Sequence, residues 1–389
     1  MSFLRAARAA LAVPSRLPRI LVAALVVILA VLSLSCGNSK PLTAPNHNAY
    51  VTLPSDGSVL LLHIDGATGA ITAGAKTPST VNTTPNGVAL LPSRKFLYAV
   101  NSFADTISIF NVAADGTLTL SGTPAQAGLS PWAAVIDPSG KYLLVTNQLG
   151  SNVSVFSIDA ATGALSEVPN SPFPSDTNPS EILITASGKF VYVTNGETVT
   201  GFSFSNSNGA LSLVPGAPAP SGAGAFGLAV DTSERFLYVA NPSATNPPPF
   251  ASTTGNISGF NIDPVTGALT PMPGSPFTAT AGTGPTAVAV DPGGRFVYAV
   301  TPGATSSIWC FTIDPTNGQL VSVANSPFSQ AAGGLFALFD PSGSYFYIGG
   351  GPGNGIAGYT YNPSTGALTA IAGSPFFTGP APGKMVLSE

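Results

Sequence analysis

Residues 189–195 read Lys-Phe-Val-Tyr-Val-Thr-Asn, and this short run decides the fold because related runs recur along the chain. Aromatic and β-branched residues alternate in it, and turn-forming residues flank it on both sides, as expected for a β-strand. The related runs are residues 96–101, 142–147, 236–241, 296–301 and 345–349. The sequence therefore contains one structural unit that is repeated several times.

A second signature, glycine followed two residues later by Leu or Ile, counts the units. It occurs at Gly69, Gly116, Gly163, Gly209, Gly267, Gly318 and Gly366, at intervals of 47, 47, 46, 58, 51 and 48 residues. One unit contains four apolar runs separated by Pro, Gly, Asn and Asp: residues 133–137, 141–147, 152–158 and the run after Gly163. Each unit is therefore predicted to form four short antiparallel strands.

A four-stranded unit of this length cannot cover both of its own faces, and packing the units radially solves the problem. The prediction is an all-β protein, a seven-bladed β-propeller over residues 49–389. The first unit lacks its innermost strand, but Pro-Gly-Lys-Met-Val-Leu at 382–387 aligns with Pro-Thr-Ala-Val-Ala-Val at 285–290. The C-terminal strand should therefore pair with Ala49–Leu53 and close the ring, which removes exposed sheet edges. Because the first strand of each unit is almost wholly apolar, we expect it to be buried on both faces.

The N-terminal residues 1–35 are predicted to be a signal peptide. Basic residues precede an apolar run from Ile20 to Leu34, which is shorter than the ~20 residues that a membrane-spanning helix needs. The basic residues are Arg5, Arg8, Arg16 and Arg19. We therefore expect the protein to be exported.

The run ends Leu-Ser-Leu-Ser-Cys-Gly at residues 32–37, which resembles the lipobox of bacterial lipoproteins. The resemblance implies a diacylglycerol attached to Cys36, and residues 36–48 then form the lipidated, flexible tether. The protein would contact the membrane only through this anchor, at the outer membrane, facing the periplasm, or at the cell surface. The alternatives are an ordinary cleaved signal or an uncleaved anchor.

Composition excludes some classes of function. Only 8% of the residues are charged, the net charge is −4 and no basic block occurs, so nucleic-acid binding is not expected. Repeated aspartates such as Asp159, Asp263 and Asp314 begin turns in separate units, where they cannot converge on one ion. We therefore expect no metal and no cofactor. Separately, we expect the protein to be a monomer. Cys310 and His63 fall at a packed and at a solvated position of the third strand, respectively.

Candidate site residues lie where the innermost strands begin, around the ring centre. The third position of each opening reads Gly87, Ala133, Glu181, Gly227, Ala287, Phe336 and Lys384. Glu181 and Lys384 are the charged exceptions. A carboxylate at the start of a buried strand is costly to bury, which makes Glu181 a candidate functional residue. Trp132 and Phe226 occupy the neighbouring position in blades 3 and 5.

Two further carboxylates, Asp176 and Glu197, lie in loops of the same face. An opening of the central channel that carries clustered carboxylates, one cation and two aromatic rings would hold a small neutral or cationic ligand. The alternative for Asp176 and Glu197 is that they are solvated loop charges. Blade 5 inserts residues 242–255 on this face, either as a specialised contact or as a tolerated surface insertion.

The runs at 189–195, 291–298 (Asp-Pro-Gly-Gly-Arg-Phe-Val-Tyr) and 263–269 (Asp-Pro-Val-Thr-Gly-Ala-Leu) resemble the Tyr-Val-Thr-Asn repeat of propellers. The region 49–389 as a whole resembles the seven-bladed lactonase family, whose namesake is a 6-phosphogluconolactonase. The resemblance implies metal-independent lactone hydrolysis by His, Arg and Glu around the channel. In this chain Glu181 and Lys384 occupy those positions, while the arginines begin second strands on the opposite face, so a phosphorylated lactone would meet little positive charge.

Two functions remain open from the sequence. The first is a lactonase or carboxylic-ester hydrolase with Glu181 as general base and Lys384 as oxyanion partner. The second is a non-catalytic envelope propeller that recognises a glycan, a peptide or a protein. If Glu181 is catalytic, Glu181→Gln should abolish lactone turnover and leave thermal stability nearly intact. Since blades 4 and 1 lie almost opposite each other, the distance between Glu181 and Lys384 decides whether they can share one small ligand.

Overall fold

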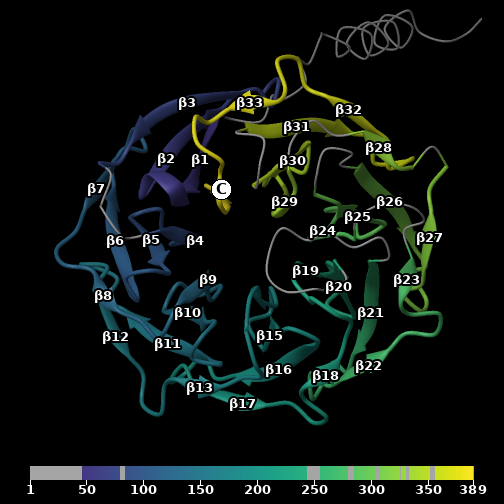
Figure 1. Cartoon of the computed structure of the whole chain (residues 1–389), viewed down its shortest axis with the longest axis horizontal. Helices are drawn as coiled ribbons and strands as arrows, with labels where there is room; N and C mark the ends of the chain where they lie inside the picture. The colour runs from purple at the N-terminus through teal and green to yellow at the C-terminus, as the bar shows by residue number, and fades with distance from the viewer. Residues whose placement is uncertain are drawn as a thin grey trace, which may run out of the picture. The chain divides into compact units, whose positions relative to one another are not determined.

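The computed structural model describes residues 46–78, 84–242, 255–278, 284–302, 307–324, 326–329, 333–350 and 355–388. These residues form seven β-sheets arranged in a ring, the blades of a propeller (Figure 1). The predicted seven-bladed fold is therefore confirmed. The predictions for the signal peptide and for Cys36, and the insertion at 243–254, lie outside the described residues. No helix in the described ranges is both long and apolar enough to cross a membrane.

Each blade carries four antiparallel strands, ordered here from the ring centre outward. Blade 1 consists of β34 (Met385–Leu387), β1 (His47–Leu53), β2 (Ser58–Ile64) and β3 (Ile71–Lys76), with the 3-10 turn η1 (Pro54–Asp56). In blades 2 to 7 the outer strand is interrupted, so a short fifth strand also pairs with the third. Blade 2 consists of β4 (Pro85–Leu90), β5 (Phe96–Asn101), β6 (Thr106–Val112), β7 (Leu118–Leu120) and β8 (Ala125–Gln126). Blade 3 consists of β9 (Pro131–Ile136), β10 (Tyr142–Asn147), β11 (Asn152–Ile158), β12 (Leu165–Glu167) and β13 (Phe173–Pro174).

The remaining four blades repeat this pattern. Blade 4 consists of β14 (Ile182–Ile184), β15 (Phe190–Thr194), β16 (Thr198–Phe204), β17 (Leu211–Leu213) and β18 (Ala219–Pro220). Blade 5 consists of β19 (Leu228–Val230), β20 (Phe236–Asn241), β21 (Asn256–Ile262), β22 (Leu269–Pro271) and β23 (Phe277–Thr278). Blade 6 consists of β24 (Ala287–Val290), β25 (Phe296–Val300), β26 (Ser307–Ile313), β27 (Leu320–Ser322) and β28 (Phe328–Ser329). Blade 7 consists of β29 (Phe336–Phe339), β30 (Tyr345–Gly349), β31 (Gly355–Tyr361), β32 (Leu368–Ala370) and β33 (Phe376–Phe377).

The C-terminal strand closes the ring, as predicted. β34 pairs antiparallel with β1, with Val51 opposite Met385 and Ala49 opposite Leu387, so the two ends of the propeller meet in one sheet (Figure 1). β1 begins at His47, two residues before the expected start. The reason is that His47 and Asn48 still pair with Ile64 and His63 of β2. The Ser388 N–H also donates to the Asn48 carbonyl at 2.8 Å.

The strands that are most buried are not the ones that the sequence predicts. The second strands are the most buried: all residues of β5 and β10 are buried, whereas β14 is half-buried along its length. The expectation that the innermost strands are buried on both faces therefore fails for β14, whereas three of the four residues of β24 are buried. Second strands are covered by neighbouring sheets on both faces, while the innermost strands also line the ring centre.

Buried tyrosines of the second strands hydrogen-bond neighbouring blades to each other. In six blades the hydroxyl donates to the carbonyl of the signature glycine of the next blade, at 2.7–3.0 Å. The pairs are Tyr50–Gly116, Tyr98–Gly163, Tyr192–Gly267, Tyr238–Gly318, Tyr298–Gly366 and Tyr347–Gly69. Blade 3 has Leu144 at this position. A buried hydroxyl needs a partner, so each pair fixes the spacing between two blades.

The structure explains why these signature positions are glycine. Gly267 has φ +74°, in the left-handed region that other residues rarely adopt, and an added Cβ would lie 2.6 Å from Cε1 of Phe190 in the preceding blade. Six of the seven signature glycines pack in this way on an aromatic ring of the preceding blade. The signature thus marks the closest approach between blades.

We expect Gly267→Ala to destabilise the protein by about 2–5 kcal/mol, because it combines left-handed strain with overpacking against Phe190. The matched control is Gly216→Ala: Gly216 has φ +78°, but nothing lies within 4 Å of an added Cβ. That control should lose only about 1–2 kcal/mol. Urea unfolding followed by circular dichroism measures both, and equal losses would show that the contact between blades contributes nothing.

Cys310 and His63 occupy the predicted kinds of position. Cys310 is fully buried, and burial raises the pKa of its thiol to about 12, so it is not a reactive cysteine. His63 is exposed, and its Nδ1 lies 2.9 Å from Oδ1 of Asn48.

Candidate functional site

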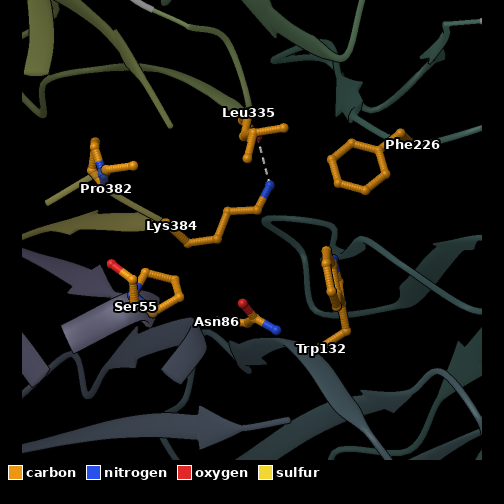
Figure 2. Close-up of a pocket in the computed structure, with 10 residues that line it drawn as sticks. Ser55, Asn86, Trp132, Phe226, Leu335, Pro382 and Lys384 are labelled. Atoms are coloured by element: carbon orange, nitrogen blue, oxygen red, sulfur yellow. Dashed lines mark hydrogen bonds between the residues drawn. The ribbon is translucent and has the colours of Figure 1, made fainter. Parts of the chain in front are cut away.

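A cavity of about 220 Å³ opens at the ring centre, at the end where the innermost strands begin (Figure 2). Its lining comes from five of the seven blades: Pro54, Ser55, Asn86, Trp132, Phe226, Leu335, Ala381, Pro382, Gly383 and Lys384. Most of the lining is apolar, and Lys384 is the one charged residue in it. We call this cavity and its rim the mouth.

The two charged residues predicted from the sequence meet here. Nζ of Lys384 lies 2.7 Å from Oε1 of Glu181, and the two side chains are only 18% and 15% exposed. Nζ also donates to the Leu335 carbonyl at 2.7 Å (Figure 2). Glu181 Oε1 has no directed hydrogen bond from a described residue, so the contact with Lys384 is a charge contact. The distance condition set from the sequence is met, because the carboxylate and the ammonium are in contact, and of the two only Lys384 lines the cavity.

Threonines of the second strands position these residues. Thr52 accepts the Lys384 N–H at 2.9 Å and donates to the Asn86 carbonyl at 2.8 Å. Thr194, the threonine of the run at 189–195, accepts the Glu181 N–H at 3.1 Å and donates to the Phe226 carbonyl at 2.7 Å. Each hydroxyl therefore connects the strand opening of its own blade with that of the next.

Sequence reasoning treated these threonines as strand residues and missed their role. The available signal was a repeated threonine at the end of otherwise apolar second strands, where a buried hydroxyl needs partners. Asn86, Leu335 and Pro54 were missed as well. Neither their residue types nor their positions in the repeat distinguish them from the equivalent residues of the other blades.

The aromatic pair predicted at the mouth is present. The rings of Trp132 and Phe226 meet edge to face, with centroids 6.4 Å apart and an interplanar angle of 76°. Nζ of Lys384 lies 5.0 Å from the Phe226 centroid, within range of a cation–π interaction (Figure 2). Trp132 Nε1 is buried and has no hydrogen-bond partner among the described residues. An indole N–H in this situation is a donor available to a ligand or to water.

Asp176 and Glu197 do not line the cavity. Asp176 Oδ2 accepts a hydrogen bond from the Thr198 hydroxyl at 2.7 Å, and Glu197 is exposed on the neighbouring loop. These placements favour the reading as loop charges over direct contact with a ligand in the cavity.

Positive charge is scarce at the mouth. Eight basic residues lie in the described ranges, and six of them are in the turns between first and second strands, on the opposite face. The six are Arg94, Lys95, Lys141, Lys189, Arg235 and Arg295. Lys76 pairs with Asp56 at 2.6 Å, and Lys384 pairs with Glu181. The described residues also contain no group of three His, Cys, Asp or Glu side chains arranged to hold a metal.

The model of the family described as "Lactonase, 7-bladed beta-propeller" matches residues 42–176, 167–276 and 253–386, which is most of the chain. The chain belongs to the seven-bladed β-propeller lactonase family. No curated protein matches it. The expected resemblance, drawn from the Tyr-Val-Thr-Asn-type runs, is therefore confirmed at the level of the family.

Several solved structures have the same fold over nearly their whole length. A putative 6-phosphogluconolactonase from Bacteroides fragilis superposes with a TM-score of 0.71 at 19% identity, covering 91% of this chain and 100% of that one. The periplasmic gluconolactonase PpgL of Pseudomonas aeruginosa gives 0.70 at 18% identity, covering 89% and 99%. A putative 6-phosphogluconolactonase from Bacteroides uniformis gives 0.70 at 19% identity, covering 88% and 99%. At these identities the likeness shows the fold alone.

Proposed function

We propose that this lactonase-family propeller hydrolyses a neutral lactone or carboxylic ester at the mouth. The observation that carries the proposal is the contact of Glu181 with Lys384, a carboxylate and an ammonium 2.7 Å apart beside a mostly apolar cavity. Ester hydrolysis needs a base for water and donors for the developing oxyanion, and these two groups can supply both.

Two donors are available for the oxyanion. An ammonium has three N–H groups; that of Lys384 donates one to Leu335 and meets Glu181 through a charge contact, which leaves at least one N–H for a ligand. The buried Trp132 Nε1 is a second donor. A carbonyl oxygen that binds both would be stabilised as it gains charge in the transition state.

Glu181 does not itself line the cavity, whereas Lys384 does. Base catalysis therefore requires the ammonium to shift from the carboxylate toward the substrate oxygen, which admits a water molecule to Glu181. The carboxylate takes a proton as the water oxygen bonds to the carbonyl carbon. The tetrahedral intermediate then breaks its bond to the ring or ester oxygen, and Glu181 returns the proton to that leaving oxygen. The product of a lactone is the hydroxy acid.

The substrate should be neutral. Inside the mouth the charge of Lys384 is already compensated by Glu181, so a phosphate group would lose hydration without gaining a counter-charge. A non-catalytic propeller is the second candidate, because the same compensation also leaves a neutral, partly aromatic site suited to binding alone.

A lactone panel tests the proposal. We expect the full chain to hydrolyse glucono-δ-lactone with a kcat/KM at least about 10-fold above that for its 6-phosphate, which corresponds to about 1.4 kcal/mol between the two transition states. A pH-stat measures the acid released, with heat-inactivated protein as the control for spontaneous opening. A preference for the phosphorylated lactone would contradict the charge argument. Binding without turnover of any lactone or ester would favour the second candidate.

A further inference from the structure

Three large apolar side chains are exposed together on the face that carries the mouth. Phe103 is 74% exposed, Leu129 58% and Leu149 75%. They lie in the β5–β6, β8–β9 and β10–β11 connections of blades 2 and 3. The other large apolar residues exposed among those the structure describes lie on outer strands or in a turn of the opposite face: Leu120, Leu213, Val265, Val321 and Phe377.

Hydrogen bonds hold the three connections together. The Ser130 N–H donates to Oδ1 of Asp105 at 2.6 Å, which joins the β8–β9 and β5–β6 connections. The Gln148 N–H donates to the Ser130 carbonyl at 2.9 Å, which joins the β10–β11 connection to them. Phe103, Leu129 and Leu149 are each within two residues of these bonds. We call the three side chains the platform.

Two short links connect the platform with residues of the mouth. Leu129 precedes the cavity residue Trp132 by three positions in the same connection and strand. The cavity residue Asn86 donates through Nδ2 to the Ser102 hydroxyl at 2.9 Å, and Ser102 is the neighbour of Phe103. A ligand that leaves the cavity between Asn86 and Trp132 would therefore meet the platform.

The size of the cavity and the charge of the loops indicate the occupant. The cavity of about 220 Å³ is smaller than the about 300–1,000 Å³ of typical small-molecule sites, so it has room for a polar head but not for a long tail. The three connections carry Asp105 and no Lys or Arg. Surfaces that bind anionic membranes are usually basic, so these loops fit an uncharged chain better than a lipid bilayer.

We propose that Phe103, Leu129 and Leu149 form a subsite for the aliphatic tail of a ligand whose neutral oxygen-bearing head occupies the mouth. For the proposed hydrolase, the substrate class becomes lactones or esters with an alkyl or acyl chain of several carbons; this assignment rests on the proposed function. The tail subsite itself makes a separate prediction, because any ligand with a neutral polar head and an alkyl chain should use it.

Binding of alkyl β-glucosides tests the subsite without any hydrolysis. Butyl, hexyl and octyl β-glucoside, below their micellar concentrations, are titrated calorimetrically into the full chain. We expect affinity to rise about 2- to 4-fold for each added methylene, the gain for burying aliphatic surface. The triple variant Phe103→Ser, Leu129→Ser, Leu149→Ser should bind all three equally weakly. The matched control Leu213→Ser, Val321→Ser, Phe377→Ser removes three exposed apolar side chains from outer strands and should keep the wild-type increment.

The same variants are then assayed with γ-lactones of increasing side-chain length. A chain-length gain for the glucosides without turnover of any lactone would support the subsite and remove the proposed function. Turnover that is independent of chain length, together with a flat glucoside series, would keep the function and overturn the subsite. The subsite is also overturned if the platform variant keeps the gain in glucoside affinity with chain length. If that variant instead loses binding to neutral lipid vesicles, or self-association measured by light scattering, the platform serves one of those contacts.

Discussion

Glu181→Gln is expected to lower lactone turnover about 10²- to 10⁴-fold, the range for loss of a general base. The neutral amide cannot accept the proton of the attacking water, and Lys384 loses the charge that it contacts at 2.7 Å. Lys384→Met should lower kcat about 10²- to 10³-fold, as removal of one oxyanion donor does. Steady-state kinetics on the preferred lactone measures both.

The ion pair also changes the expected stability of these variants. From the sequence, Glu181→Gln should leave thermal stability nearly intact, but the structure places the carboxylate against a largely buried ammonium. Removing one partner of a buried pair costs about 3–5 kcal/mol, because the other charge stays uncompensated. The double variant Glu181→Gln, Lys384→Met should recover part of this stability and none of the activity.

Urea unfolding of the two single variants and the double variant measures the coupling between the charges. Glu167→Gln is the control for the chemical change, since Glu167 is an exposed carboxylate on β12 that contacts Ser171. It should alter neither stability nor turnover. Wild-type turnover in Glu181→Gln would remove Glu181 from the mechanism, and additive stability losses would show that the pair is not coupled.

Ending the chain after Ala381 is expected to abolish cooperative folding of the propeller. The deletion removes β34, its pairing with β1 and the buried side chain of Met385. It also removes the Lys384 and Ser388 hydrogen bonds to Thr52 and Asn48. Each hydrogen bond contributes about 1 kcal/mol and a buried Met about 2–5 kcal/mol, which together approach the entire stability of a typical domain.

Circular dichroism melting and size-exclusion chromatography measure the effect. Ending the chain after Ser388 instead removes only Glu389 and serves as the control, with an unchanged melting temperature. We expect the longer deletion to aggregate, since β1 becomes an unpaired inner edge. A cooperative melt within a few degrees of the wild type would show that ring closure by β34 does not hold the propeller together.

The repeat made most of the fold predictable. The runs at 96–101 and 142–147 and the signature glycines set the number of blades and the order of strands, because each depends on patterns within about 50 residues. The closing partner of Ala49–Leu53 was predictable because residues 382–387 align with the first strand of another repeat. The burial gradient was not predictable in the same way. Apolar composition identifies a buried strand but does not say which face meets a neighbouring blade and which lines the ring centre.

For the site, the sequence determined which residues stand at the openings of the innermost strands, and so nominated Glu181, Lys384, Trp132 and Phe226. Only the tertiary structure decided that the two charges touch, that Asp176 accepts a hydrogen bond from Thr198, and that three large apolar loop residues are exposed. The physical reason is one of range. Strand alternation and turn chemistry are local, whereas contact across the ring depends on how closely seven blades pack, which aromatic rings and glycines between the blades set.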